Sequence, residues 1–188
     1  MNMHNDMYES EKELTLVEVI KLLRNYIKYI STLKKICEKK MIKSRMPNFP
    51  EVISENIVRI IINRILKLDV KNSSIGGDLE FKGKRFEVKG FISNGPISFG
   101  PKEKWFEIYF LDSKLFEKSI FACYRCRMKN TDFCWKNIKV NSFETYEKQC
   151  INKRRPRINF YKLQKQLGNK LECIFNNSID KIRISGYD

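Results

Sequence analysis

The segment from residue 78 to residue 91 constrains the fold of this 188-residue chain more than any other part of the sequence. Two short extended stretches, residues 78–81 and 85–91, flank a Lys-Gly-Lys triplet. Strand-forming runs separated by a short, glycine-containing break are typical of a β-hairpin. The sequence therefore predicts a pair of antiparallel strands here.

Three charged side chains of this hairpin are expected to meet at one point. Glu87 and Lys89 are two positions apart on one strand, so they share a face, and Val88 between them points to the other. The hairpin places Asp78 alongside Glu87, although the two are nine positions apart. Two carboxylates bind Mg²⁺ and leave positions for water and a phosphate oxygen, and such a metal activates water. Lys89 can orient that water and offset negative charge on the phosphorus centre.

The same residues also fit an interpretation without chemistry. A Glu-x-Lys triplet is common in a lysine-rich chain, and Glu87 and Lys89 can simply pair on a solvated hairpin face. A lysine beside carboxylates on a core-facing strand is nevertheless costly to bury unless it is paired. From the triplet alone, both interpretations stay open.

Two amphipathic helices are expected before the hairpin. The first covers about residues 13–39, with Thr15 and Glu18 forming a capping box near its start. The second covers about residues 51–68 and begins near Pro50 or Ser54. Apolar side chains at helical spacing mark the predicted buried stripes. They are Leu16, Val17, Ile20, Leu23, Ile27, Ile30, Leu33 and Ile36 in the first helix, and Val52, Ile57, Ile60, Ile61, Ile65 and Leu68 in the second.

After the hairpin, residues 105–111 and 119–127 read as strands, and residues 161–167 as a short helix. Residues 41–50 contain two prolines and read as a linker, and residues 73–77 read as a turn. This order predicts an α/β fold. We expect residues 1–45 to form an N-terminal helical segment and residues 46–188 to form the core.

The charge of the chain favours a polyanionic partner. Thirty-seven Lys and Arg residues against 22 Asp and Glu residues give a net charge of +15 at pH 7. A basic surface gains sequence-independent affinity for nucleic acid by releasing counterions. The alternative is the codon bias of an AT-rich genome, which also enriches lysine. The longest apolar run is too short to cross a bilayer and no signal-peptide core is visible, so we expect a cytoplasmic protein without a membrane segment.

The cysteines and the single histidine limit other chemistry. Cys123, Cys126, Cys134 and Cys150 are candidate thiolate ligands for zinc, but their spacing is irregular, and ordinary partly buried thiols are the favoured interpretation. His4, the only histidine, lies near the N-terminus. This position argues against histidine-based nuclease chemistry and against histidine ligands for zinc.

The order of a Gly-Asp pair, a hairpin and Glu87-Val88-Lys89 resembles the PD-(D/E)xK nuclease motif. Gly77 stands where that superfamily usually has proline, a position that shapes the turn and does not bind metal. A longer series of motifs over about residues 50–112 looks like small type II restriction endonucleases. It comprises Ile53-Ser54-Glu55-Asn56-Ile57-Val58, Gly77-Asp78-Leu79, Glu87-Val88-Lys89, Gly95-Pro96-Ile97-Ser98-Phe99-Gly100-Pro101, Lys104-Trp105 and Ile108-Tyr109-Phe110-Leu111-Asp112.

This resemblance implies a restriction-endonuclease-like core, a mixed sheet flanked by helices, with an N-terminal helical extension. It implies Mg²⁺-dependent hydrolysis of a specific double-stranded DNA site, with 5′-phosphate ends, by a homodimer. Glu55 lies where many members carry a metal-binding glutamate, although the helix dipole also favours acids such as Glu51 and Glu55 there. The alternatives are a junction resolvase or repair nuclease of the same superfamily, and a non-catalytic DNA-binding protein.

Two basic segments are candidates for DNA contact. Ser98, Lys102 and Lys104 lie in a loop with two Gly-Pro pairs, next to the expected metal site, where they can reach phosphates. Arg154, Arg155 and Arg157 form a second cluster, which suits phosphate or base contact. A tight connection for the first segment and a solvated basic loop for the second are the alternatives.

Overall fold

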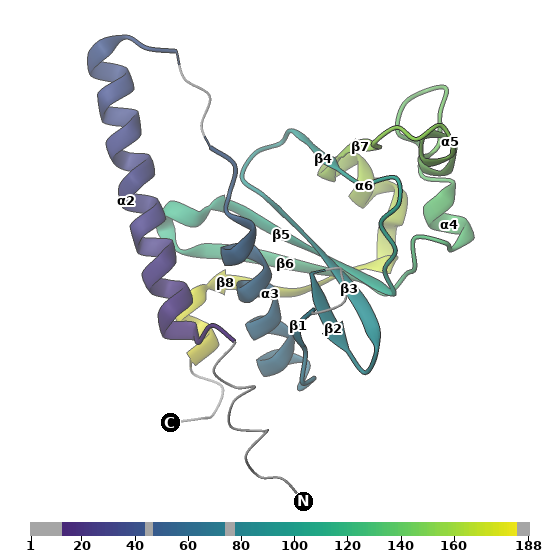
Figure 1. Ribbon diagram of the computed structural model, residues 1–188, viewed down its shortest axis with the longest axis horizontal. Helices are drawn as coiled ribbons and strands as arrows, with labels where there is room; N and C mark the ends of the chain where they lie inside the picture. Colours follow the sequence, from purple (N-terminus) through teal and green to yellow (C-terminus); the bar gives the residue numbers. More distant parts are fainter. Residues whose placement is uncertain (1–12, 44–46, 74–77, 184–188) are drawn as a thin grey trace, which may run out of the picture.

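The structure, a computed structural model, describes residues 13–43, 47–73 and 78–183, and its centre is a six-stranded mixed sheet (Figure 1). The strand order is β1-β2-β3-β5-β6-β8. β3 and β5 are parallel, and the other neighbours are antiparallel. The strands are β1 (Lys71–Asn72), β2 (Leu79–Phe81), β3 (Lys84–Phe91), β5 (Glu107–Leu115), β6 (Ile120–Cys126) and β8 (Leu171–Ser178).

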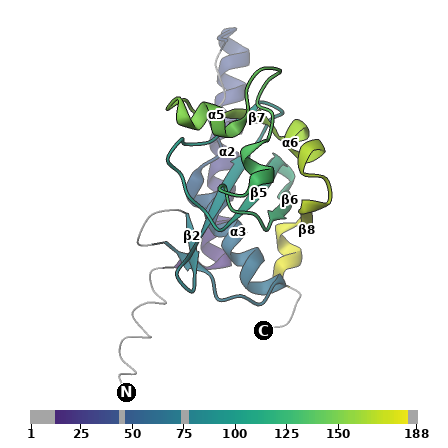
Figure 2. The same cartoon turned by 90° about the vertical axis from the view of Figure 1, so that its right-hand side faces the viewer.

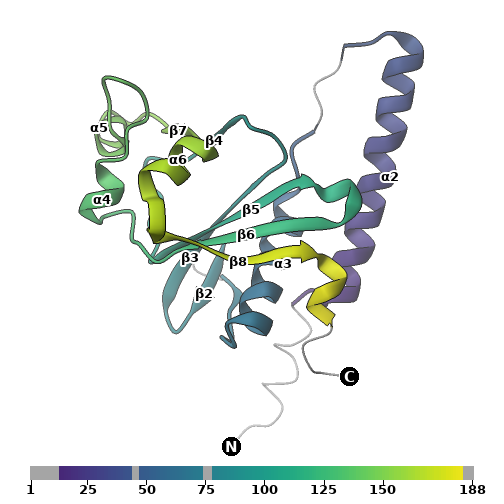
Figure 3. The same ribbon diagram turned by 180° about the vertical axis from the view of Figure 1, so that it is seen from behind.

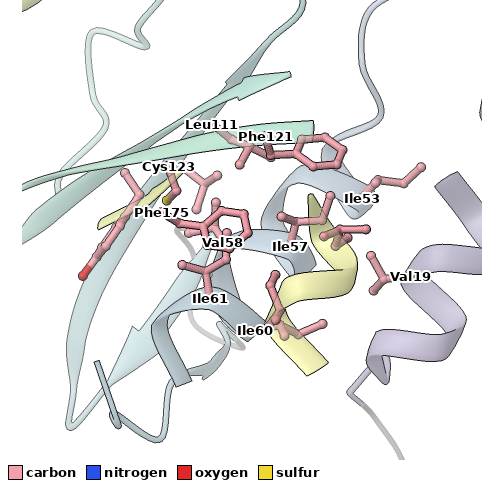
Figure 4. Packing of buried hydrophobic residues seen from close by; sticks show 14 of the residues in the cluster. Val19, Ile53, Ile57, Val58, Ile60, Ile61, Leu111, Phe121, Cys123 and Phe175 are labelled. Carbon is pink, nitrogen blue, oxygen red and sulfur yellow. The ribbon is translucent and has the colours of Figure 1, made fainter. Parts of the chain in front are cut away.

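One face of the sheet is covered by α3 (Glu51–Ile65), with α2 (Leu16–Lys40) packed outside it. Figure 4 shows Ile57, Val58 and Ile61 of α3 pointing at strand residues such as Phe121. The terminal 3-10 turn η3 (Ile179–Arg183) joins this cluster through Ile179 and Ile182. Seen from behind in Figure 3, β5, β6 and β8 lie side by side with α3 on their far side.

The other face is covered by short elements at one end of the sheet (Figure 2). They are the two-stranded ribbon of β4 (Pro96–Ser98) and β7 (Arg157–Asn159), the helices α4 (Phe133–Lys136), α5 (Tyr146–Ile151) and α6 (Phe160–Leu167), and the 3-10 turn η2 (Gly168–Lys170). Their core is aromatic, with Trp105 and Trp135 edge to face at 5.3 Å. A further 3-10 turn, η1 (Phe116–Lys118), follows β5.

The helical predictions are confirmed in position but only partly in their buried faces. The capping box of Thr15 and Glu18 is present, and α3 begins after Pro50. Both predicted buried stripes were wrong at their edges. Four of the residues assigned to them are exposed, namely Val17, Ile36, Val52 and Ile65, and other apolar residues of the same helices are buried. Since α3 lies between the sheet and α2, it buries a wide face rather than one stripe. The additional buried positions are Val19 in α2, and Ile53, Val58 and Ile62 in α3.

The predicted hairpin is confirmed as β2 and β3. Lys82 and Gly83 adopt φ values of 50° and 72°, the left-handed pair that a tight two-residue turn between twisted strands requires. The predicted strands near residues 105 and 119 are β5 and β6, and the short helix is α6. The predicted turn at residues 73–77 lies almost wholly outside the described residues. Strand β8 and the β4–β7 ribbon were not predicted. Among the described residues, no helix combines the length and the apolar character that a membrane span requires.

Candidate active site

β3 carries the predicted Glu-x-Lys pair on the face opposite α3. Phe86 and Val88 belong to the core under α3, so Glu87 and Lys89 point toward the β4–β7 side of the sheet. The side chain of Glu87 is 6 % exposed and that of Lys89 is 17 % exposed. Lys89 Nζ donates a hydrogen bond to Glu87 Oε1. Glu87 is therefore buried and Lys89 is mostly buried, so the solvated hairpin face considered from the sequence was the wrong alternative.

Asp78 lies beside this pair, immediately before β2. Its Oδ2 accepts a hydrogen bond of 2.6 Å from the backbone N–H of Val88. Burial raises the pKa of Asp78, against the lowering effects of the Val88 bond and of Lys89. The hairpin thus brings together the three residues that the sequence singled out.

Glu55 reaches the same region from α3. A Cβ atom on Gly90 would lie 2.8 Å from Ser54 Cβ, so the bare backbone of β3 allows the first turns of α3 to approach it closely. Glu55 follows Ser54 in this helix. Burial and then repulsion from Asp78 and Glu51 raise the pKa of Glu55 to about 7. Glu55 is therefore close enough to Asp78 to sense its charge.

The sequence reasoning missed a fourth acid of the site, which lies next to Lys89. Glu103, in the loop before β5, has both carboxylate oxygens 3.4 Å from Lys89 Nζ. Glu103 belongs to no recognised motif. The signal that could have found it is that it is the only acid between residues 92 and 106.

These carboxylates suit a divalent cation. Burial, followed by repulsion from Asp78, raises the pKa of Glu87 to about 7 even though Lys89 opposes the shift. A cation would relieve this repulsion. In the described part of the chain no three acidic, histidine or cysteine side chains form a ready ligand set. Mg²⁺ needs fewer, because it is commonly held by one or two carboxylates and keeps several waters. Asp78 and Glu87 fit that requirement.

The predicted DNA-contact residues lie on the same side of the sheet. Ser98 of β4 and Arg157 of β7 are register partners in the ribbon, and both are exposed. Lys102 and Lys104 are exposed on either side of Glu103. The ribbon thus joins the two basic segments, which are far apart in the sequence.

The arginine cluster is not uniform. Arg154 forms an ion pair with Glu144, and this bond contributes most to lowering the pKa of Glu144 to about 2. Arg155 is exposed, and no ion pair to it is found among the described residues. Arg154 is therefore already engaged within the protein.

The cysteine geometry argues against the four-thiolate zinc site. Cys123 packs in the core under α3, whereas Cys126 packs in the aromatic core on the opposite face. Burial raises the pKa of both thiols, that of Cys126 to about 12. Because the sheet separates them, these two thiols cannot bind the same ion.

Comparison with known proteins identifies the chain. A family model, that of the Bsp6I restriction endonuclease, matches residues 16–166, from the start of α2 almost to the end of α6. No curated protein and no solved structure matches the chain. Restriction endonucleases generally depend on a divalent metal and act on DNA. Since the matched segment covers most of the sequence, the protein belongs to the Bsp6I restriction endonuclease family and is a type II restriction endonuclease, as its resemblance to small enzymes of that class predicts.

Proposed function

We propose that Asp78, Glu87 and Lys89 form the catalytic centre, which hydrolyses phosphodiester bonds in a specific double-stranded DNA site with Mg²⁺. The observation that carries this proposal is the hydrogen bond from Val88 N to Asp78 Oδ2, which fixes Asp78 beside the Glu87–Lys89 pair. Asp78 and Glu87 hold the metal, and Glu55 is a candidate third ligand that would have to move toward them from α3.

The metal, when bound, polarises the phosphate and lowers the pKa of a water molecule. Asp78 and Glu87 provide its oxygen ligands, which match the preference of a hard cation. Lys89 orients the attacking water and donates to the phosphate as negative charge develops. Burial lowers the pKa of Lys89, but Glu87 and Glu103 outweigh burial and raise it overall, so the side chain stays cationic.

The exposed side of the β4–β7 ribbon guides the DNA to this centre. Ser98, Lys102 and Lys104 contact phosphates from the β4 side, and Arg155 and Arg157 from the β7 side. Such contacts set the position of the duplex without reading its sequence. Arg154 supports the loop through Glu144 and makes a smaller contribution to DNA affinity.

Within the N-terminal helical segment of residues 1–45, α2 serves as the dimerisation helix of a homodimer, and residues 46–188 form the catalytic core. α2 projects beyond the sheet at its C-terminal end (Figure 1). Leu22, Tyr29 and Ile36 recur every seven residues along α2 and are 37 %, 54 % and 53 % exposed. An apolar seam with this period suits a second helix. Two copies would place one active site on each strand of a palindromic site.

Mapping the ends of digested plasmid DNA tests the proposed function. The wild-type protein is expected to cut at one recurring sequence with Mg²⁺ or Mn²⁺, and Ca²⁺ is expected to support binding without cleavage. Asp78→Ala should bind DNA without cutting it. Glu117→Gln, at an exposed acid of η1 that pairs with Lys34 of α2, is the matched control. Full cleavage by Asp78→Ala, or in excess EDTA, would contradict the proposal.

The dimer has a separate test. Tyr29→Glu together with Ile36→Glu should convert the protein to a monomer in sedimentation velocity while leaving its circular dichroism unchanged. Lys28→Glu together with Lys35→Glu, on exposed polar positions of the same helix, controls for the added charge. A dimer that survives the first pair of substitutions places the interface elsewhere.

A further inference from the structure

Lys89 lies between two carboxylates, and only one of them belongs to the recognised motif. Its ammonium bonds to Glu87 Oε1 and lies 3.4 Å from both oxygens of Glu103. Glu103 comes from the loop before β5, fourteen positions beyond Lys89. The second contact therefore depends on how that loop folds back over β3.

The loop holds Glu103 in place from several directions. The backbone N–H of Glu103 donates to Gly100 O at 3.3 Å, and its carbonyl accepts from Asn130 Nδ2 at 2.6 Å. A Cβ atom on Gly100 would lie 2.6 Å from Glu103 Oε1, so a residue with a side chain there would push the carboxylate away. Glu103 Oε2 is buried and receives no hydrogen bond within the described residues. The carboxylate of Glu103 is thus held in place, and its Oε2 lies near Lys89 without a hydrogen bond. Glu103 can therefore accept a hydrogen bond from Lys89 if Lys89 leaves Glu87.

The proposed metal site creates a need for such a change. While the ammonium of Lys89 bonds to Glu87 Oε1, it repels a divalent cation and competes with it for the charge of this carboxylate. An ammonium that leaves Glu87 needs another acceptor, because a buried charge without a partner is costly. Among the described residues, Glu103 is the other carboxylate within ion-pair distance of Lys89.

We propose that Glu103 is a positioning residue that accepts the ammonium of Lys89 when Glu87 binds the metal. This inference rests on the proposed metal site. Glu103 binds neither the metal nor the substrate. It removes the competition between Lys89 and the cation for Glu87, and it keeps the ammonium directed at the phosphate.

The binding of Mn²⁺ without DNA tests the inference independently of turnover. Calorimetric titrations compare the wild-type protein, Glu103→Gln, Lys89→Met and the double variant. Glu103→Gln should weaken Mn²⁺ binding about tenfold, the size typical of a residue that orients a metal ligand. In the Lys89→Met background, where no ammonium competes, the same substitution should have no effect.

Each other result has a definite meaning. Equal weakening in both backgrounds would show that Glu103 acts on the cation itself, and an unchanged affinity in Glu103→Gln would show that it does not act on the site. Either result overturns the inference. Loss of the proposed metal site is recognised separately, because Asp78→Ala and Glu87→Ala would then bind Mn²⁺ as the wild type does.

Cleavage kinetics give a second readout. Glu103→Gln should lower kcat about tenfold with little change in KM for DNA. Glu103→Asp, which keeps the charge, should recover part of the loss. Glu117→Gln controls for the change in net charge, and thermal unfolding controls for damage to the loop. An equal loss with Asp and Gln, together with a lower melting temperature, would indicate a purely structural role and contradict the inference.

Discussion

Two buried acids lie on the neighbouring strands β3 and β5, on opposite faces of the sheet. On β5, Glu107 is 7 % exposed and accepts hydrogen bonds from Tyr109 Oη at 2.9 Å and from Arg125 Nε and Nη2 at 2.8 and 2.9 Å. On β3, Glu87 is buried to a similar degree. Among the described residues it receives one side-chain hydrogen bond, from Lys89.

The two sites differ in how completely the carboxylate is satisfied. Both oxygens of Glu107 are bonded, and the planar guanidinium of Arg125 fits them in pairs. Within the part of the chain that the structure describes, no hydrogen bond reaches Glu87 Oε2. The nearby acids Asp78 and Glu103 repel this carboxylate. The Glu107–Arg125 pair is fully hydrogen-bonded and ties β5 to β6. The Glu87–Lys89 pair is not, so it costs stability and leaves a place for a cation. Burial of an acid by itself therefore does not identify an active site; incomplete satisfaction is the better sign.

The largest expected difference between the two acids is in catalysis. Glu87→Gln should lower kcat on the order of a thousand-fold, because it removes a metal ligand and an anchor of Lys89. Glu107→Gln should cut DNA at close to the wild-type rate once folded, since it lies on the other face of the sheet. Plasmid cleavage at 25 °C measures both. Comparable losses of kcat in the two variants would contradict the assignment of Glu87 to the active site and of Glu107 to the fold.

Stability should show the opposite order. Glu107→Gln leaves the mostly buried Arg125 without its counter-charge, which costs about 3 kcal/mol of the free energy of unfolding. Glu87→Gln removes a repelled carboxylate, and we expect the metal-free protein to lose less than about 1 kcal/mol or to gain stability. Urea unfolding in EDTA gives both values. Greater damage from Glu87→Gln would mean that the Glu87–Lys89 pair holds the fold together.

The pH dependence of stability sharpens the comparison. The ordinary pKa of a glutamate, 4.5, is raised to about 7 in the folded state for Glu87 and Glu55. Between these values the unfolded chain has lost protons that the folded protein retains. The contribution of Glu87 and Glu55 to the free energy of unfolding therefore falls as pH rises from 4.5 to 7, and it stays constant above pH 7.

For Glu87 this loss is on the order of 3 kcal/mol. Unfolding of the metal-free protein should show it, and Glu87→Gln should remove its share, whereas Glu117→Gln should not. Glu144, with its pKa lowered to about 2, acts below pH 4.5 and does not obscure this range. A wild-type stability that rises between pH 5 and 7 in parallel with that of Glu87→Gln would count against the raised pKa of Glu87.

The smallest effect is expected on DNA affinity, where the arginine cluster also contains one paired side chain and two exposed ones. Arg154 is satisfied by Glu144, whereas Arg155 and Arg157 are exposed. Replacing Arg155 and Arg157 by Gln should weaken binding to random duplex several-fold and lower the salt slope by about 2, if each meets one phosphate. Arg154→Gln should change the slope less. If cognate preference collapses instead, the pair reads bases.

Arg24→Gln, on the exposed side of α2, controls for the loss of one positive charge. Fluorescence anisotropy at several salt concentrations measures all four proteins. If the double variant and Arg24→Gln behave alike, the ribbon is a solvated surface, and the net charge of +15 has no local role there.

The sequence by itself determined the hairpin and the residues that it carries. Lys82-Gly83 accepts the left-handed turn, and the two-residue period of a strand puts Glu87 and Lys89 on one face. These are local rules, so they hold whatever surrounds the segment. The capping box of α2 is local in the same way, because Thr15 and Glu18 are one turn apart.

Only the tertiary structure decided which apolar residues are buried and which acids join the site. The buried face of α3 is wider than its periodicity indicates because α3 is covered on two sides, and β8 finds its place only by pairing with β6. Glu103 reaches Lys89 because its loop folds back over β3, and Glu107 is satisfied by an arginine from the next strand. Contacts between distant segments depend on how whole elements pack, and no local pattern in this chain encodes that.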